Sequence, residues 1–297
     1  MDVHTKNTRL QQLLYMIEQF RIARQREISL GKYMPWKRFT QQELNDEACA
    51  TYKNLLVGRS LRIPDRNRIL TIADYLELSS DGRNDLLLAA GYLPIQTEIS
   101  GNALEQAIGQ AQHTMNVLPY PAMIVTHTED IKGYNEFFRR LFGFPESHAY
   151  DHLMNRIDLH FNPDLPVYLR STFDRSSFEK WKTHAVQGIR LFKKNHILSR
   201  YDDWYQRVLN RFEHYLAEEQ WLENALVTGN IDNGELTQTI LTRSESNGEF
   251  IPIQYKQVSI TTGSLMTPKV QVFLPVDDAA RRIFEELGCH VLSTNIK

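Results

Sequence analysis

Residues 40–58 read TQQELNDEACATYKNLLVG, and this stretch decides the fold of the first third of the chain. The Thr40 hydroxyl can accept a hydrogen bond from the Glu43 amide while the Glu43 carboxylate bonds back to Thr40. That pair is a capping box, which is typical of the first turn of a helix. Leu44 and Ala48 follow at a spacing of four and share its inward face. The pattern predicts a short amphipathic helix.

A second short helix is predicted directly after it. Cys49-Ala50 forms a tight break, and Thr51 is a good N-cap for a helix over Tyr52–Val57. Gly58 suits the left-handed position that ends such a helix. Two short helices a few residues apart predict a helix-turn-helix.

Three further helices complete the first region. Apolar residues at spacings of three and four predict a helix over Arg9–Arg26. Pro64 suits the first turn of a fourth helix, and Ser79 and Ser80 can cap a fifth over Asp81–Ala90. We therefore expect residues 1–97 to form an all-α five-helix domain.

A polar stretch, Gln96–Asn102, marks the expected boundary, so residues 98–297 should form a second domain. Its predicted strands are Met123–Thr126, Asp130–Asn135, Ile251–Thr261 and Lys269–Pro275, the last two joined by the turn Thr262-Gly263-Ser264. Its predicted helices are Ala103–Val117, a helix capped by Asn135, Ser177–Lys194, Tyr201–Glu218 and Asp277–Leu287. Few, locally paired strands predict an antiparallel sheet flanked by helices, and the chain as a whole should be α+β.

Positive charge is concentrated at the front of the chain. Residues 1–70 hold 13 Lys and Arg against 7 Asp and Glu, although the whole chain has a formal charge of −2. A local basic surplus beside a helix-turn-helix favours binding to DNA phosphates. A helical bundle with a solvated charged face is the alternative. The candidate DNA-binding residues are Gln41, Thr51, Tyr52, Lys53, Asn54, Arg59 and Arg62.

Aromatic residues are concentrated in the second region. The chain has 31 aromatic residues (14 Phe, 13 Tyr and 4 Trp), and 18 of them lie within residues 120–215. Such density suits either the wall of an apolar ligand cavity or an ordinary packed core. The candidate lining residues are Met123, Val125, Tyr134, Phe137, Phe138, Leu141, Phe142, Phe161, Phe192 and Trp204.

The first region resembles the Cro/repressor-type (XRE) helix-turn-helix family. Thr40-Gln-Gln-Glu-Leu44 matches the usual opening of the second helix of that family. Asn54-Leu-Leu-Val-Gly-Arg59 resembles the end of its recognition helix, and Ile72-Ala-Asp-Tyr-Leu-Glu-Leu78 resembles its fourth helix. The resemblance implies a DNA-binding domain over residues 1–97.

A more specific resemblance covers most of the chain. Arg62-Ile63-Pro64, Asn84-Asp-Leu-Leu-Leu-Ala-Ala-Gly-Tyr-Leu-Pro94 and Leu118-Pro-Tyr-Pro-Ala122 resemble the MmyB-like regulators. In that family an XRE domain is followed by a PAS-like ligand-binding domain associated with fatty-acid-like molecules. The resemblance implies a homodimeric transcription regulator of double-stranded DNA with a hydrophobic effector. Arg190 and Arg170 are candidate partners of an acidic head group.

Other functional classes find little support in the sequence. There is no GxSxG elbow, no GxxxxGK[ST] loop and no GxGxxG, so we expect neither an enzyme nor a dedicated cofactor. His148, His152 and His160 lack a neighbouring cysteine or an HExxH motif, so no metal site is expected. The chain has no apolar run long enough to span a bilayer and no secretory signal, which predicts a cytoplasmic protein without membrane insertion. A ligand-binding enzyme or a protein-interaction module with a helical docking domain remains the alternative.

Overall fold

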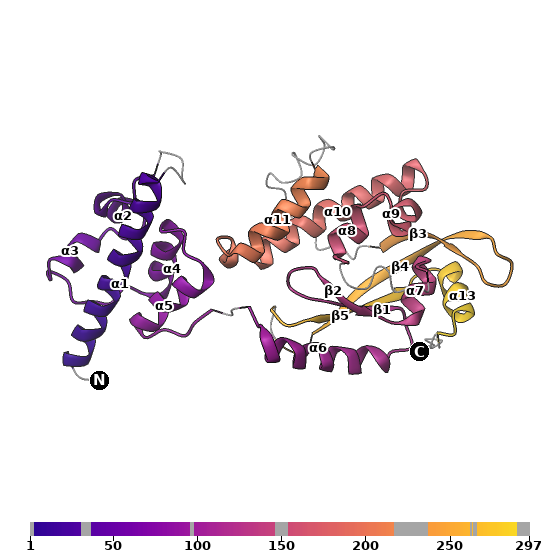
Figure 1. The fold of residues 1–297 in the computed structure, drawn as a ribbon, viewed down its shortest axis with the longest axis horizontal. Helices are drawn as coiled ribbons and strands as arrows, with labels where there is room; N and C mark the ends of the chain where they lie inside the picture. The colour runs from indigo at the N-terminus through magenta and orange to yellow at the C-terminus, as the bar shows by residue number, and fades with distance from the viewer. Residues whose placement is uncertain are drawn as a thin grey trace, which may run out of the picture. The chain divides into compact units, whose positions relative to one another are not determined.

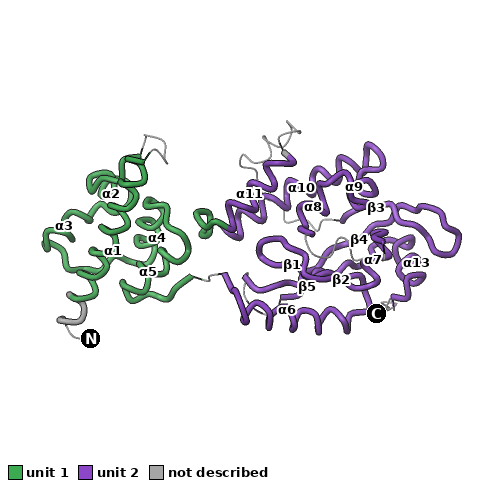
Figure 2. Tube along the Cα trace, in the orientation of Figure 1, with its two compact units in different colours: residues 1–97, 198–203 green, residues 98–197, 204–297 purple. Residues whose placement is uncertain are grey.

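The computed structural model describes residues 3–30, 37–95, 98–145, 154–216, 237–261, 263 and 266–289. The chain forms two compact units (Figure 2). Unit 1 comprises Met1–Thr97 and Leu198–Asp203, and unit 2 comprises Glu98–Ile197 and Trp204–Lys297. Residues 98–297 were expected to form the second domain as one continuous stretch. In the division observed here Leu198–Asp203, a segment inside that stretch, is grouped with unit 1.

Unit 1 contains the five helices that the sequence predicts. They are α1 (Val3–Ser29), α2 (Gln41–Glu47), α3 (Tyr52–Leu56), α4 (Arg66–Tyr75) and α5 (Ser80–Ala90) (Figure 1). The N-cap of α4 is Asp65, whose side chain accepts from the Arg68 amide, so Pro64 lies before the helix instead of in its first turn. Ser79 caps α5, and Gly91 ends it with φ of 83°.

The core of unit 1 is formed by one apolar face from each helix. Leu13 and Ile17 of α1, Leu44 of α2 and Ile69 and Ile72 of α4 are all completely buried. The spacings of three and four within α1 and α4 explain why each helix presents a single stripe to this core. Burial of these stripes, more than helix propensity, holds helices as short as α2 and α3 in place.

Unit 2 is built on a five-stranded antiparallel sheet in the order β2-β1-β5-β4-β3. The strands are β1 (Ala122–Val125), β2 (Ile131–Tyr134), β3 (Thr237–Arg243), β4 (Phe250–Thr261) and β5 (Lys269–Pro275). The helices are α6 (Gly101–Asn116), α7 (Glu136–Phe142), α8 (Arg156–Phe161), α9 (Pro166–Ser171), α10 (Arg175–Asn195), α11 (Asp203–Leu216) and α13 (Asp278–Glu286), with a 3-10 turn at Ile197–Ser199. The protein is therefore α+β, with an antiparallel sheet flanked by helices.

The two faces of the sheet are covered by different helices. α6 runs along one face, where Met115 packs against Ile124 and Val270. α8, α9, α10 and α11 lie on the opposite face (Figure 1). Side chains alternate between faces along a strand, so Met123 of β1 points away from α6. The sheet is thus a central layer with helices on both sides.

Among the described residues, the structure adds β3, α8, α9 and the 3-10 turn Ile197–Ser199, none of which the sequence predicted as an element. β3 reads TQTILTR, with too few apolar residues to give a clear alternation. Its pairing with β4 over the whole of its length supplies the hydrogen bonds that hold it. In the predicted turn after β4, only Gly263 lies within the described residues.

Candidate functional site

The capping box that opens α2 is present. The Glu43 amide donates to the Thr40 hydroxyl (3.1 Å), and the Thr40 amide donates to the Glu43 carboxylate (3.3 Å). The Tyr75 hydroxyl of α4 donates to the same carboxylate (3.0 Å). Glu43 therefore fixes the start of α2 and also ties it to α4.

Most of the predicted DNA-binding side chains are exposed on α2, on α3 or beside α3. Lys53 and Asn54 are exposed at the start of α3, and Gln41 is exposed at the start of α2. Thr51 is also exposed and precedes α3, but its side chain makes no capping hydrogen bond. Arg59 and Arg62 are exposed in the segment that follows α3. The exposed candidates therefore include amide, hydroxyl and cationic side chains, and the Gln41 amide donates to Glu18 of α1 (2.9 Å).

Tyr52 is placed differently from the other candidates. Its side chain is 0% exposed, and its hydroxyl donates to Oε1 of Glu18 in α1 (2.6 Å). Burial raises the pKa of Tyr52, and the hydrogen bond and charge of Glu18 raise it further. Tyr52 is therefore a core residue that secures α3 against α1, and it is not available to contact DNA. Its spacing of three from Leu55, which is also buried, is the signal that could have identified it.

A cavity of about 530 Å³ lies within unit 2. Its walls come from the sheet face opposite α6 and from α8, α10 and α11. The apolar lining residues include Met123, Phe142, Ile157, Leu159, Phe161, Val167, Ile189, Phe192, Phe212 and Phe273. A volume of this size is typical of pockets that hold small molecules.

Four of the predicted lining residues face this cavity, namely Met123, Phe142, Phe161 and Phe192. The others lie elsewhere in unit 2. Val125, Tyr134, Phe137, Phe138 and Leu141 belong to or pack against the core around α7 and α13, and Trp204 packs in a second core with Phe192. Arg190 and Arg170 are not lining residues. Aromatic density therefore could not separate residues of the cavity wall from residues of the core.

The cavity also has a polar wall that the sequence analysis did not predict. Gln257 and Ser259 of β4 and Lys269 and Gln271 of β5 line it from the sheet. Each pair is two residues apart and so shares a face of its strand. Polar residues at alternating positions were indistinguishable from a solvated strand face, and only the helices packed above them make this face a cavity wall.

A chain of hydrogen bonds connects the sheet to α10. The Tyr255 hydroxyl donates to Oε1 of Gln238 (2.7 Å), and Nε2 of Gln238 lies 2.9 Å from Nε2 of His184. The Gln238 amide can only donate there, so His184 accepts at Nε2 and carries its proton on Nδ1. His184 Nδ1 is buried without a partner among the described residues, as are His160 Nε2 and Gln187 Oε1.

Three lining imidazoles are neutral at neutral pH. Burial lowers the pKa of His184 to about 4, and the charge of Arg156 contributes. Burial also lowers the pKa of His196 to about 4, with contributions from Lys269 and His127. Burial holds the pKa of His160 well below its ordinary value. The histidines therefore offer neutral hydrogen-bonding groups instead of positive charge.

Positive charge in the cavity comes from Arg156 and Lys269. Glu129 is the only carboxylate among the lining residues and forms an ion pair with Arg156. Burial lowers the pKa of Lys269, and the charge of Glu129 opposes that change. The wall thus carries one more basic than acidic side chain beside a large apolar surface. Such a wall suits a molecule with an apolar body and an acidic group.

No group of metal-ligating side chains is found within the described residues, and His148 and His152 lie outside them. Among the helices that the structure describes, none is both long and apolar enough to cross a membrane. No protein-family model matches the chain, and no curated protein matches it.

Proposed function

We propose that the protein is a sequence-specific DNA-binding transcription regulator, with unit 1 as an XRE-type helix-turn-helix domain. The observation that supports this best is the pair of short helices α2 and α3, in which Gln41, Lys53 and Asn54 are exposed, followed by exposed Arg59 and Arg62. Asn54 can pair with the edge of an adenine, and the basic side chains can bind phosphates. Tyr52 is excluded from this set because it is buried.

Unit 2 acts as the sensor in this proposal. The antiparallel sheet with a cavity on one face supports the PAS-like interpretation, in which a sheet cups its ligand. The proposed effector is an acid with an apolar body, such as a fatty acid. Its chain would lie against Phe142, Phe161 and Phe212, and its carboxylate would bind Lys269. Burial of each methylene contributes about 0.8 kcal/mol, so chain length should dominate affinity.

The regulator would act as a homodimer, because a two-fold symmetric protein matches the two half-sites of a palindromic operator. The effector would bind one arrangement of unit 2 more tightly than another and so shift the population of DNA-binding states.

The test is DNA binding by the full chain with duplexes selected from a random-sequence pool. Lys53→Ala and Arg59→Ala should each weaken binding, and each lost phosphate contact should reduce the slope of log affinity against log salt by about 0.9. Lys180→Ala is the matched control, since it removes an exposed positive charge from α10 in unit 2. Failure to select any duplex with the folded protein would refute the proposal, as would equal salt slopes in all three variants.

A ligand-binding enzyme is the second candidate, because titratable groups gather in the cavity. His160, His184, Glu129 and Lys269 all line it. Mass spectrometry of the molecule extracted from the purified protein separates the two functions. A sensor returns an added fatty acid unchanged, whereas an enzyme converts it into a product whose formation stops in His184→Gln.

A further inference from the structure

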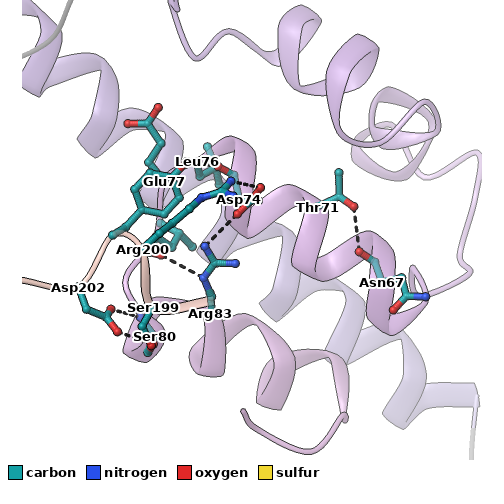
Figure 3. A network of polar contacts seen from close by, with 12 residues as sticks. Asn67, Thr71, Asp74, Leu76, Glu77, Ser80, Arg83, Ser199, Arg200 and Asp202 are labelled. Carbon is teal, nitrogen blue, oxygen red and sulfur yellow. Dashed lines mark hydrogen bonds and ion pairs between the residues drawn. The ribbon is translucent and has the colours of Figure 1, made fainter. Parts of the chain in front are cut away.

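The segment Leu198–Asp203 connects α10 to α11, both of which otherwise belong to unit 2, yet it packs within unit 1 (Figure 2). Its contacts are with the end of α4 and the start of α5 (Figure 3). We call this segment the 198–203 loop. Its contacts are polar and mostly buried, unlike those of an ordinary surface connection.

The firmest contact of the loop is made by Asp202. Its carboxylate accepts from the backbone amide of Ser80 (2.6 Å) and from the Ser80 hydroxyl (2.6 Å). The Ser80 hydroxyl has a single proton, which it donates to Asp202. The Ser199 hydroxyl therefore donates to the Ser80 hydroxyl, with the two oxygen atoms 3.1 Å apart. Asp202 and Ser80 are only 8% and 5% exposed. Hydrogen bonds to a buried charged group are strong and costly to break.

Asp202 also accepts a hydrogen bond from a backbone amide of α5 that has no partner within the helix. Ser80 is the first residue of α5, and the first amides of a helix have no partner within the helix. The negative charge of Asp202 lies at the positive end of the helix dipole. The loop therefore supplies part of the N-terminal cap of α5, although it is more than a hundred residues away in sequence.

Asp74 makes a second connection, from α4. It pairs with Arg83 of α5 (3.0 Å) and with Arg200 of the loop. Arg83 is 1% exposed and also donates to the backbone carbonyl of Leu78 (3.2 Å). The Tyr201 hydroxyl lies 3.4 Å from the Asp74 carbonyl, which it can reach as a donor. Consecutive residues of the loop thus contact α4 and α5 through a shared network (Figure 3).

One end of the loop continues into the cavity wall, and the other continues into a residue that packs against that wall. His196, two residues before the loop, lines the cavity. Trp204, the next residue after the loop, packs edge-on against His196, with ring centroids 5.3 Å apart. Trp204 also meets Phe192, another lining residue. A molecule that displaces His196 must therefore disturb both stems of the loop together.

We propose that the 198–203 loop is a latch that transmits occupation of the cavity to the DNA-binding unit. With the cavity empty, Asp202 and Arg200 hold α4 and α5 in one arrangement. A ligand that moves His196 and Trp204 withdraws Asp202 from Ser80, which releases α5 and alters DNA affinity. The inference rests on the proposed function and adds the element by which the two sites are coupled.

The experiment measures DNA affinity of the full chain by fluorescence anisotropy, with and without saturating dodecanoate. Dodecanoate binding is measured separately by thermal shift. In the wild-type protein the ratio of the two DNA affinities should be at least about fivefold, within the usual range of allosteric coupling. Asp202→Asn should bring that ratio below about twofold while both ligands still bind, because the variant mimics the released state.

Two matched controls and a milder variant accompany Asp202→Asn. Asp203→Asn makes the same change at the exposed neighbour, and Thr71→Ala removes a hydroxyl of α4 that bonds only to Asn67 of its own helix. Both should keep the wild-type ratio. Ser80→Ala removes only the hydroxyl bonds and leaves the amide bond to Asp202, so it tests the latch even where Asp202→Asn does not fold.

The outcomes separate the latch from the proposed function. A wild-type ratio retained in both Asp202→Asn and Ser80→Ala overturns the latch and leaves the regulator intact. A wild-type ratio of one, with both ligands bound, also overturns the latch. If the wild-type protein binds no DNA or no dodecanoate, the proposed function fails and the latch fails with it.

Discussion

Acid should destabilise unit 2 steeply, because imidazoles of the cavity wall are held neutral. Burial lowers the pKa of both His184 and His196 to about 4, compared with about 6.5 for an unfolded histidine. Above pH 6.5 neither the folded nor the unfolded state protonates them, and their full contribution to stability is present. Between about pH 6.5 and pH 4 only the unfolded state binds the protons, so stability falls as the pH falls. Below about pH 4 both states are protonated and the loss levels off.

The size of the effect follows from the number of protons. One proton bound only by the unfolded state changes the free energy of unfolding by about 1.4 kcal/mol per pH unit. Two give about 2.7 kcal/mol per pH unit at most, and partial access of solvent to His184 reduces this to roughly 2. Burial also lowers the pKa of His127 and His160, so some slope remains when the first two imidazoles are removed.

Urea unfolding at a series of pH values measures this slope. The fluorescence of Trp181 and Trp204 reports on unfolding of this part of unit 2. Both residues lie in the same core cluster as Phe192, and Trp204 packs against His196. The double variant His184→Gln, His196→Asn should lose about 2 kcal/mol per pH unit of slope between pH 6.5 and 4. His113→Gln is the control, since His113 is exposed on α6. A double variant with the wild-type slope would refute the assignment of neutral buried imidazoles.

The remaining predictions concern the cavity, a backbone position and the boundary. Thermal stability should rise with each carbon added to a fatty acid until the cavity is full, and Phe142→Trp should shorten the longest chain that still adds stability; a flat response in lipid-stripped protein would leave the aromatics as ordinary core. Gly143→Ala should cost about 1–2 kcal/mol by chemical denaturation, because Gly143 has a φ of 71°, which is unfavourable for a residue with a Cβ, and the Arg170 guanidinium would have to move; an unchanged midpoint would contradict this. Limited proteolysis should cut first within residues 96–102, whereas a first cut inside Ile69–Leu76 would contradict the two-unit division.

Local sequence determined most of the helices and four of the five strands that the structure describes. The capping box of Thr40 and Glu43 and the N-cap Asn135 begin α2 and α7 where predicted, because both signals act within a single turn. The strand β5 occupies its predicted range, since its apolar run lies between clear breaks. Each of these features depends on residues that are close in sequence, and for that reason it can be derived from a pattern.

Tertiary structure alone decided the features on which the proposals depend. The spacing of three between Tyr52 and Leu55 indicates one helix face, but only the tertiary structure shows that the Tyr52 hydroxyl bonds to Glu18 of α1. From the sequence, Lys269 and Gln271 resemble a solvated strand face, whereas in the structure they line the cavity together with residues of α8 and α10. Asp202 resembles an ordinary loop aspartate until it meets the amide of Ser80. Burial and charge pairing arise from contacts between residues far apart in the chain, and local periodicity carries no information about which distant segments will meet.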